Sequence, residues 1–327
     1  MNLPRPPAVV LQQRPLVDFK LGNKNRGVFV PLTRKERVDR ALRGEEVDRP
    51  PFTLWYHFRL HKFPGDRHAA ATLDFHRRLR TDLVKVMCDY PYPKPSGQWH
   101  ELRVDANPFP EQIRALELIR DGLAGQAYFV ETLFNPWNVA EKLSSPADVL
   151  KLMSEKPQAL LDALEAIAKS QINHARRAVE IGASGIFLAI GSAQDGILSP
   201  EGYTKFSEPF DRMILEAVQS CPLNVLHLHG DKLYFEPFFS GWQTAVINYS
   251  IHGTGMAMAD VRRRYSGVLM GGLDEVNFRT LTAEQLKEQW QSAQAAAGSR
   301  FILSPGCSVP DNTADEELLR LVNLLGA

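Results

Sequence analysis

Short apolar segments alternate along this chain with stretches of helical periodicity, and this alternation constrains the fold most. Each apolar segment is four to seven residues long, as expected for strands buried on both faces of a parallel sheet. The eight expected strands are Phe52–Phe58, Leu83–Asp89, Tyr128–Thr132, Gly185–Ile190, Asn224–His229, Ala245–Tyr249, Val268–Leu273 and Phe301–Ser304.

Segments with a period of about 3.6 residues lie between several of these strands, as crossover helices would. Those segments are Ala147–Leu152, Ala159–Ile181, Pro200–Ser220 and Ala283–Ala297. Strand-helix repeats of this number favour an α/β fold of the closed (β/α)8 TIM-barrel type. A doubly wound open sheet is the rival architecture, but it usually carries a Gly-rich phosphate loop after its first strand, and Trp55–Arg59 offers none.

The beginning of the chain differs in composition from the rest. Residues 1–33 are rich in Pro, Gly, Asn and basic residues and show no sustained period, which predicts an extended N-terminal arm. Thr33 is expected to cap the first helix, with Glu36 completing a capping box. We therefore expect residues 34–327 to form one barrel-shaped catalytic domain.

Charge and cysteine usage exclude several classes of function. The chain has 38 Lys and Arg against 38 Asp and Glu, with no long basic run, so nucleic acid and anionic membranes are not expected partners. Apolar runs such as Ile186–Ile190 are too short to span a bilayer. Cys88, Cys221 and Cys307 lie far apart, which fits a reducing cytoplasm. A cytoplasmic enzyme with a small-molecule substrate is expected.

In such barrels, the loops that follow the strands build the active site. The polar residues that follow the expected strands are His57, Asp89, Tyr90, Glu131, Asn135, Gln194, Asp195, His227, His229, Asp231, Asn248, His252, Asp274, Asn277 and Cys307. Other histidines fall on expected helices or polar loops, and we expect most of them to be exposed to solvent: His61, His68, His76, His100 and His174.

The most specific local feature is the pair of histidines in Leu226–Gly230. His227 and His229 are two residues apart on a strand, so their imidazoles project to the same face. Together with a thiolate from Cys307, they would supply the three protein ligands of an open catalytic zinc site. The alternative is that the histidines are hydrogen-bonded core residues and that Cys307 is a small buried hydrophobe.

Two further features have both a functional and a structural interpretation. Asp89 follows an apolar run, so partial desolvation would suit it to proton transfer or to binding a cationic group, whereas the alternative is a helix N-cap. Trp137, with Phe134 and Pro136, would either form an aromatic wall of the pocket or pack in the core.

Several segments together resemble one protein superfamily. The helix-to-strand lead-in spans Lys35–Gly44 and Asp48–Pro51, and a turn follows at Asn135–Trp137. The remaining segments are Gly182–Ala183, Ile197–Tyr203 with Pro209, and Pro305–Cys307 with Thr313. From about residue 33 to the C-terminus, the chain resembles the uroporphyrinogen decarboxylase-like superfamily, which includes corrinoid-linked methyltransferases. The resemblance implies a (β/α)8 barrel that is often dimeric.

The decarboxylase branch of the superfamily fits the site residues poorly. Its members carry Arg-Gln-Ala-Gly-Arg after the first strand, where this chain has Tyr56–Leu60, so the arginines that hold substrate carboxylates are missing. Lys142 and Cys307 stand at the decarboxylase tyrosine and histidine positions, and only the acidic position is retained, as Asp89.

The methyltransferase branch fits better. It carries His-x-Cys-Gly after the fifth strand and Pro-Gly-Cys after the eighth, and this chain has His227–Gly230 and Pro305–Cys307 there. The resemblance thus implies zinc held by His227, His229 and Cys307. In that branch zinc lowers the pKa of a substrate thiol and presents a thiolate to a methyl donor. An imidazole in place of one thiolate leaves the site one unit more positive, which favours activation of water or an oxygen substrate.

These features lead to the hypothesis of a zinc-dependent methyl-transfer enzyme with Asp89, Glu131 and His57 as catalytic residues and a corrinoid, carried on a methyl-corrinoid protein, as methyl carrier. The expected substrate-binding residues are Tyr90, Asn135, Trp137, Gln194, Asp195, Asn248 and Asp274. One alternative is a metal-free decarboxylase of a small acid or tetrapyrrole, in which Asp89 stabilises a protonated intermediate. Another is a non-catalytic barrel that binds a corrinoid or tetrapyrrole.

Overall fold

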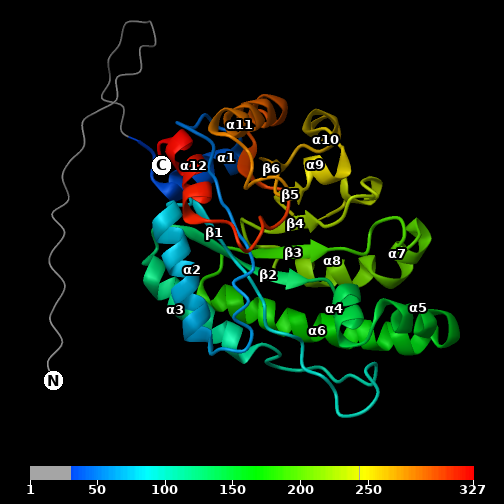
Figure 1. Cartoon of the computed structure of the whole chain (residues 1–327). Helices are drawn as coiled ribbons and strands as arrows, with labels where there is room; N and C mark the ends of the chain where they lie inside the picture. Colours follow the sequence, from blue (N-terminus) through cyan, green and yellow to red (C-terminus); the bar gives the residue numbers. More distant parts are fainter. Residues whose placement is uncertain (1–30, 243) are drawn as a thin grey trace, which may run out of the picture. The chain divides into compact units, whose positions relative to one another are not determined.

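Seven parallel strands form one curled sheet in the computed structural model of the protein, which describes residues 31–242 and 244–327 (Figure 1). Along the sheet they follow the order of the chain. They are β1 (Leu83–Val86), β2 (Tyr128–Phe134), β3 (Ile186–Ile190), β4 (Val225–Leu228), β5 (Val246–Tyr249), β6 (Val268–Leu273) and β7 (Phe301–Pro305). The α/β class and the parallel, TIM-like arrangement are thus confirmed.

Helices connect the strands, and Figure 1 shows α2 to α6 outside β1, β2 and β3. Their bounds are α1 (Arg34–Arg43), α2 (Gly65–Leu79), α3 (Pro110–Leu123), α4 (Pro136–Leu143), α5 (Pro146–Glu155), α6 (Pro157–Ile181), α7 (Pro200–Phe206), α8 (Glu208–Glu216), α9 (Ile251–Thr254), α10 (Met258–Arg264), α11 (Ala283–Ala297) and α12 (Asp315–Leu325), with a 3-10 turn η1 (Glu236–Phe238). Thr33 and Glu36 form the predicted capping box. The helical segment expected over Pro200–Ser220 forms two helices, α7 and α8, which are separated at Ser207 just before Pro209.

The segment expected to form the first of eight strands does not form one. Residues 52–58 contribute a single parallel bridge, between Phe52 and Leu303 of β7. Leu303 N donates to Pro51 O at 2.8 Å, and Asp82 N donates to Phe52 O at 2.9 Å. The segment therefore bonds to β7 on one side and to the residue before β1 on the other. Beyond Thr53 the pairing ends, and Trp55 O accepts from Val309 N of the loop after β7 at 3.1 Å. The closed eight-stranded barrel is therefore corrected to a curled sheet of seven strands.

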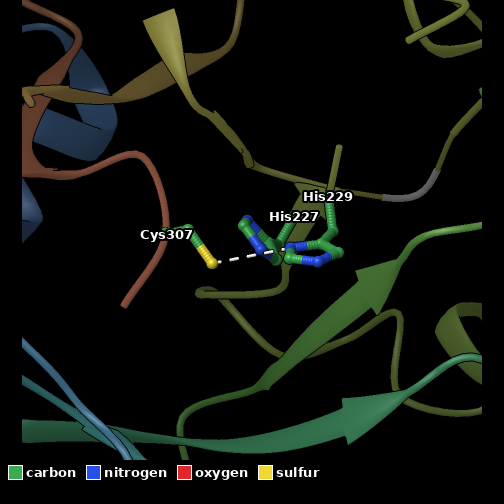
Figure 2. A group of neighbouring side chains, drawn as sticks. All are labelled: His227, His229 and Cys307. Carbon is green, nitrogen blue, oxygen red and sulfur yellow. Dashed lines mark hydrogen bonds between the residues drawn. The ribbon is translucent and has the colours of Figure 1, made fainter. Parts of the chain in front are cut away.

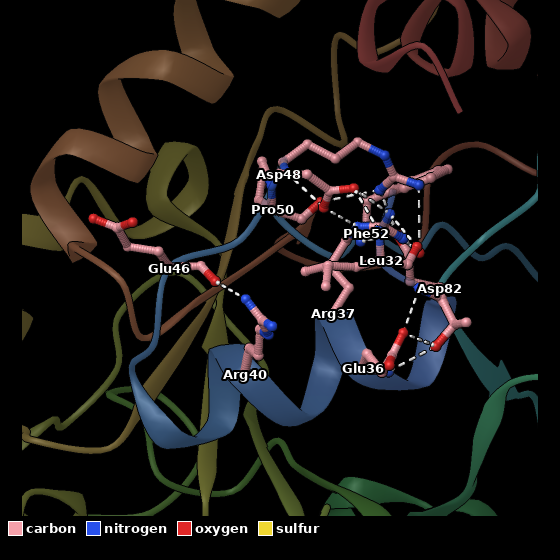
Figure 3. Close-up of polar contacts among 11 residues, drawn as sticks. Leu32, Glu36, Arg37, Arg40, Glu46, Asp48, Pro50, Phe52 and Asp82 are labelled. Atoms are coloured by element: carbon pink, nitrogen blue, oxygen red, sulfur yellow. Dashed lines mark hydrogen bonds and ion pairs between the residues drawn. The ribbon is translucent and has the colours of Figure 1, made fainter. Parts of the chain in front are cut away.

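Ion pairs stabilise this irregular segment (Figure 3). The fully buried Asp82 accepts hydrogen bonds from Arg37 of α1 and from Arg49, both at 2.5 Å, and from Phe52 N at 3.0 Å. Arg37 also donates two hydrogen bonds to Asp48, at 2.7 Å each. Because guanidinium groups donate in a fixed fork, they connect the acids in a defined geometry. The lead-in segment is thereby fixed beside β1.

The inner face of the sheet is apolar at its base. Side chains there alternate along the strands and include Leu83, Met87, Val130, Phe187, Val225, Val246, Val268, Met270 and Ile302. Lys85 lies between Leu83 and Met87 on the same face of β1, so it is a charged side chain in an apolar interior. The outer face packs against the helices.

Residues Leu32–Ala327 form one compact unit. The N-terminal arm expected over residues 1–33 lies outside the described residues except for its last three. Across the described part of the chain, no helix combines the length and the apolar character that crossing a membrane requires.

Candidate metal and substrate site

Two histidines from the end of the central strand and one cysteine that follows the last strand meet at the carboxyl ends of the strands. His227 is on β4, His229 follows it, and Cys307 follows β7 (Figure 2). The Cys307 Sγ lies 3.5 Å from the His229 Nδ1, and one ligand atom from each of the three residues lies within 4.8 Å of the others. Sulfur and nitrogen ligands of one tetrahedral zinc are about 3.6 Å apart. The donor atoms are therefore nearly at coordination spacing.

His227 is oriented by Asn248 of β5. The two side chains are joined by a hydrogen bond of 2.6 Å between His227 Nδ1 and Asn248 Oδ1. The amide orientation is fixed, since Asn248 Nδ2 lies 3.0 Å from Met270 O and 3.2 Å from Pro305 O, which only accept. Nδ1 of His227 must then donate, which leaves its Nε2 lone pair free for a metal.

Two glycines allow the ligand loops to approach other backbone segments. A Cβ on Gly306, next to Cys307, would lie 2.2 Å from Ser250 Cα. A Cβ on Gly230, which has φ +139°, would lie 2.3 Å from Gln194 Oε1. Only glycine fits either position without a shift of the neighbouring atoms. These contacts explain why glycine follows His229 and precedes Cys307.

The electrostatics of the cluster favour a thiolate. Burial acts to raise the pKa of the Cys307 thiol, but the neighbouring imidazoles of His227 and His229 lower it to about 4. Burial lowers the pKa of His227, whereas the hydrogen bond with Cys307 raises that of His229. At neutral pH the sulfur is therefore ionised, as metal binding requires.

Two adjoining cavities open beside the cluster. The first has a volume of about 440 Å³ and contacts all three ligand residues. The second has a volume of about 280 Å³ and contacts Asp89 and Tyr90. The walls of the two cavities have four residues in common: His57, Thr132, Phe134 and Lys142. A substrate in the first cavity would thus touch both the cluster and the boundary with the second.

Three of the predicted site residues line these cavities beside the ligands. His57 Nδ1 lies 2.6 Å from Asp89 Oδ1, and Arg59 N donates to Asp89 Oδ2 at 3.1 Å. Burial acts to raise the pKa of Asp89, but the hydrogen bond with His57 holds it below its usual value. Tyr90 lines the second cavity and donates to Phe63 O at 3.0 Å. His57 and Asp89 are therefore a hydrogen-bonded pair at the cavity boundary.

Glu131 was expected to be catalytic, but the structure places it outside both cavities. It lies on β2 but faces α3 and α6, where its two carboxylate oxygens bond to His174 at 2.8 Å and to Gln112 at 2.9 Å. Glu131 is fully buried and lines neither cavity. The expectation that most helical histidines are exposed is also wrong for His68, His76 and His174, which are buried.

Asn135 and Trp137 were expected to bind substrate, yet both are buried away from the cavities. Asn135 caps α4 and donates to Ser192 and Ser207, at 2.9 Å each. Trp137 is fully buried and donates to Glu141 at 2.9 Å. Trp137 thus packs in the core, which was the alternative to a role in the pocket wall. The neighbouring Phe134, in contrast, lines both cavities.

Three other expected substrate-binding residues also lie off the cavity walls. Gln194 donates to His229 O at 3.2 Å, so it contacts the backbone of a metal-ligand candidate and not the cavity. Asp195 is exposed to solvent. Asp274 accepts from the Asn277 backbone N at 3.0 Å and organises its own turn. Neither cavity is lined by any of them.

Lys85 was not expected at the site. It lines the first cavity, and its Nζ lies 4.5 Å from the centroid of Phe187 and 5.3 Å from that of Trp55. A lysine in the middle of an apolar strand segment was the signal in the sequence. Buried lysines without a partner are costly, so such a position points to function.

Comparisons with known proteins agree with this architecture. The family model for uroporphyrinogen decarboxylase (URO-D) matches residues 91–326. The methylcobamide:CoM methyltransferase MtaA of Methanosarcina barkeri (strain Fusaro / DSM 804) is 24% identical over 221 residues, which are 66% of this chain and 63% of that relative, less than two thirds of its length. A solved methyltransferase from Methanosarcina mazei shares the fold, with a TM-score of 0.70 and 20% identity over 90% of this chain and 99% of that chain. Because the family match covers well over half of the sequence, the chain belongs to the uroporphyrinogen decarboxylase (URO-D) family.

Proposed function

We propose that the protein is a zinc-dependent methyltransferase with His227, His229 and Cys307 as the metal ligands. The observation that carries this proposal is the meeting of these three side chains at the wall of a cavity of about 440 Å³. Open catalytic zinc sites use three protein ligands and leave the fourth position to water or substrate. Here the cavity would supply that fourth position.

The residues fit the metal in both chemistry and orientation. Two imidazole nitrogens and one thiolate are preferred zinc donors. Asn248 occupies Nδ1 of His227, so the Nε2 lone pair of that ring remains free to bind the metal. When bound, zinc would polarise a substrate thiol or hydroxyl and lower its pKa. With one thiolate and two neutral ligands the site keeps one positive charge, so both a sulfur and an oxygen acceptor are compatible with it.

His57 and Asp89 would serve proton transfer at the cavity boundary. Asp89 engages Nδ1 of His57, so Nε2 remains available to an acceptor group in the cavity. Trp55, Phe134 and Phe187 line the same cavity and would exclude water from the reacting groups. In this account Asp89 is a positioning residue that acts through His57, and Glu131 supports β2 from outside.

The methyl donor is proposed to be a methylated corrinoid, because the relative from Methanosarcina barkeri is named a methylcobamide:CoM methyltransferase. The acceptor is proposed to be a small thiol. Both assignments rest on that likeness and on the metal-ligand set together.

The test is a methyl-transfer assay with methylcobalamin and small thiols. The rate is measured from the decrease of the methylcobalamin absorbance. Zinc-loaded wild type and Cys221→Ala should turn over, because Cys221 lies outside the cluster. Cys307→Ala should lose at least about tenfold in rate. Equal rates with and without the metal would contradict the proposal, and release of CO2 from a small acid by the metal-free protein would support the decarboxylase alternative.

A further inference from the structure

Lys85 is a buried amine that the proposed zinc chemistry does not use. It projects from β1 into the inner face of the sheet, is 7% exposed, and lines the cavity of about 440 Å³ together with His227 and Cys307. Among the described residues, its only polar contact is the thioether Sδ of Met87, at 2.7 Å. The amine thus has no hydrogen-bonded counter-charge of its own.

The surroundings of Lys85 favour its neutral form. The rings of Trp55 and Phe187 offer cation-π attraction, but at 5.3 and 4.5 Å these contacts return less than the burial of an ammonium group costs. Burial lowers the pKa of Lys85 to about 7, although Cys307 acts in the opposite direction. Near neutral pH a large share of the molecules therefore carry a free amine lone pair.

We propose that Lys85 captures a small aldehyde or ketone in this cavity as an imine. A neutral amine at the wall of a largely apolar cavity is the arrangement that activates a lysine as a nucleophile. Trp55, Phe134 and Phe187 supply apolar surface for the body of the ligand, so a carbonyl compound with a short hydrocarbon chain fits best.

The chemistry balances without a further reactant. The Nζ lone pair attacks the carbonyl carbon, the C=O π electrons move to the oxygen, and one Nζ proton passes to that oxygen to give a carbinolamine. The second Nζ proton then passes to the hydroxyl, which leaves as water while the nitrogen lone pair forms the C=N bond. No oxidant or reductant is needed, and zinc takes no part, so this inference is independent of the proposed methyl transfer.

The test uses the metal-free full chain near neutral pH, with limiting isobutyraldehyde and cyanoborohydride, which reduces any imine to a stable secondary amine. Peptide mass mapping then gives the rate of alkylation at each lysine. Lys151 is the internal control, because it lies exposed on α5, away from the cavity. Lys85 should react at least about tenfold faster than Lys151, since an exposed lysine is almost entirely protonated near neutral pH.

Two variants separate this role from simple packing. Lys85→Arg keeps a cation in the cavity but no nucleophilic amine, so the fast alkylation should vanish, whereas Lys142→Met should retain it. Circular dichroism establishes that each variant is folded. Alkylation of Lys85 no faster than that of Lys151 in the wild type would overturn the proposal, whatever the zinc content of the protein.

Discussion

Asn248 accepts a hydrogen bond from His227 at 2.6 Å and is itself anchored on the backbone of β6 and β7. Through this relationship three strands fix the tautomer and the ring orientation of one metal ligand. Residues that orient a ligand in this way typically contribute a factor of about 10 to 100 in metal affinity.

Replacing Asn248 should therefore weaken zinc binding without removing any ligand. We expect Asn248→Ala to bind zinc about 10- to 100-fold more weakly, measured by competition with a chromophoric chelator. Asn323→Ala, at an exposed position on α12, is the control and should bind zinc like the wild type. An unchanged zinc affinity in folded Asn248→Ala would show that the hydrogen bond from His227 to Asn248 does not contribute to metal binding.

Asp211 should make the stability of the protein depend on pH. Burial raises the pKa of this carboxyl to about 7, although hydrogen bonds from Asn135 and Ser207 act to lower it. Between pH about 4 and 7 the folded protein then holds a proton that the unfolded chain has released, so the free energy of unfolding falls as pH rises through this range. The effect is at most on the order of 4 kcal/mol and is complete above pH about 7.

Urea unfolding of wild type and Asp211→Asn at several pH values measures this contribution. As pH rises to about 7, the wild type should lose unfolding free energy relative to Asp211→Asn. Above that pH the difference between the two proteins should stay constant. Asp195→Asn, at an exposed site, should follow the wild-type pH curve. A difference between wild type and Asp211→Asn that is constant with pH would contradict the raised pKa.

Asp82 should be critical for stability, because it neutralises Arg37 and Arg49 beside β1. Asp82→Ala would leave the largely buried Arg49 without an acid and Arg37 with Asp48 alone, at a cost of about 3–5 kcal/mol in the free energy of unfolding. Arg43→Ala is the matched control, since it breaks an exposed ion pair on the same lead-in and should change stability very little. Chemical denaturation of both variants tests this, and similar losses in the two would refute the role of Asp82.

The sequence predicted those site features that depend on strand ends. The spacing of His227 and His229 identified a shared face, and Cys307 followed from the position of the last strand, so the three residues that meet in the structure were all expected. His57 and Asp89 were likewise expected at strand ends and line the cavities. In a parallel sheet the chain order alone brings such residues to one edge.

Other features depend on contacts that a single sequence does not encode. Glu131 is at the right place along β2 but on the other face, because Glu131 and Thr132 alternate and the inner position belongs to Thr132. Lys85 lies in a segment whose other residues are apolar, so the pattern predicts a core strand rather than a site residue. The first expected strand ends after Thr53, because Trp55 bonds to Val309, a residue far away in the chain.

Elemental analysis of zinc in wild type, Cys307→Ala and Cys221→Ala tests the central claim most directly. One metal held by His227, His229 and Cys307 predicts about one zinc per chain in the wild type and in Cys221→Ala, and loss of most of it in Cys307→Ala. Unchanged zinc in folded Cys307→Ala, or less than about a tenth of an equivalent in zinc-supplemented wild type, would contradict the assignment.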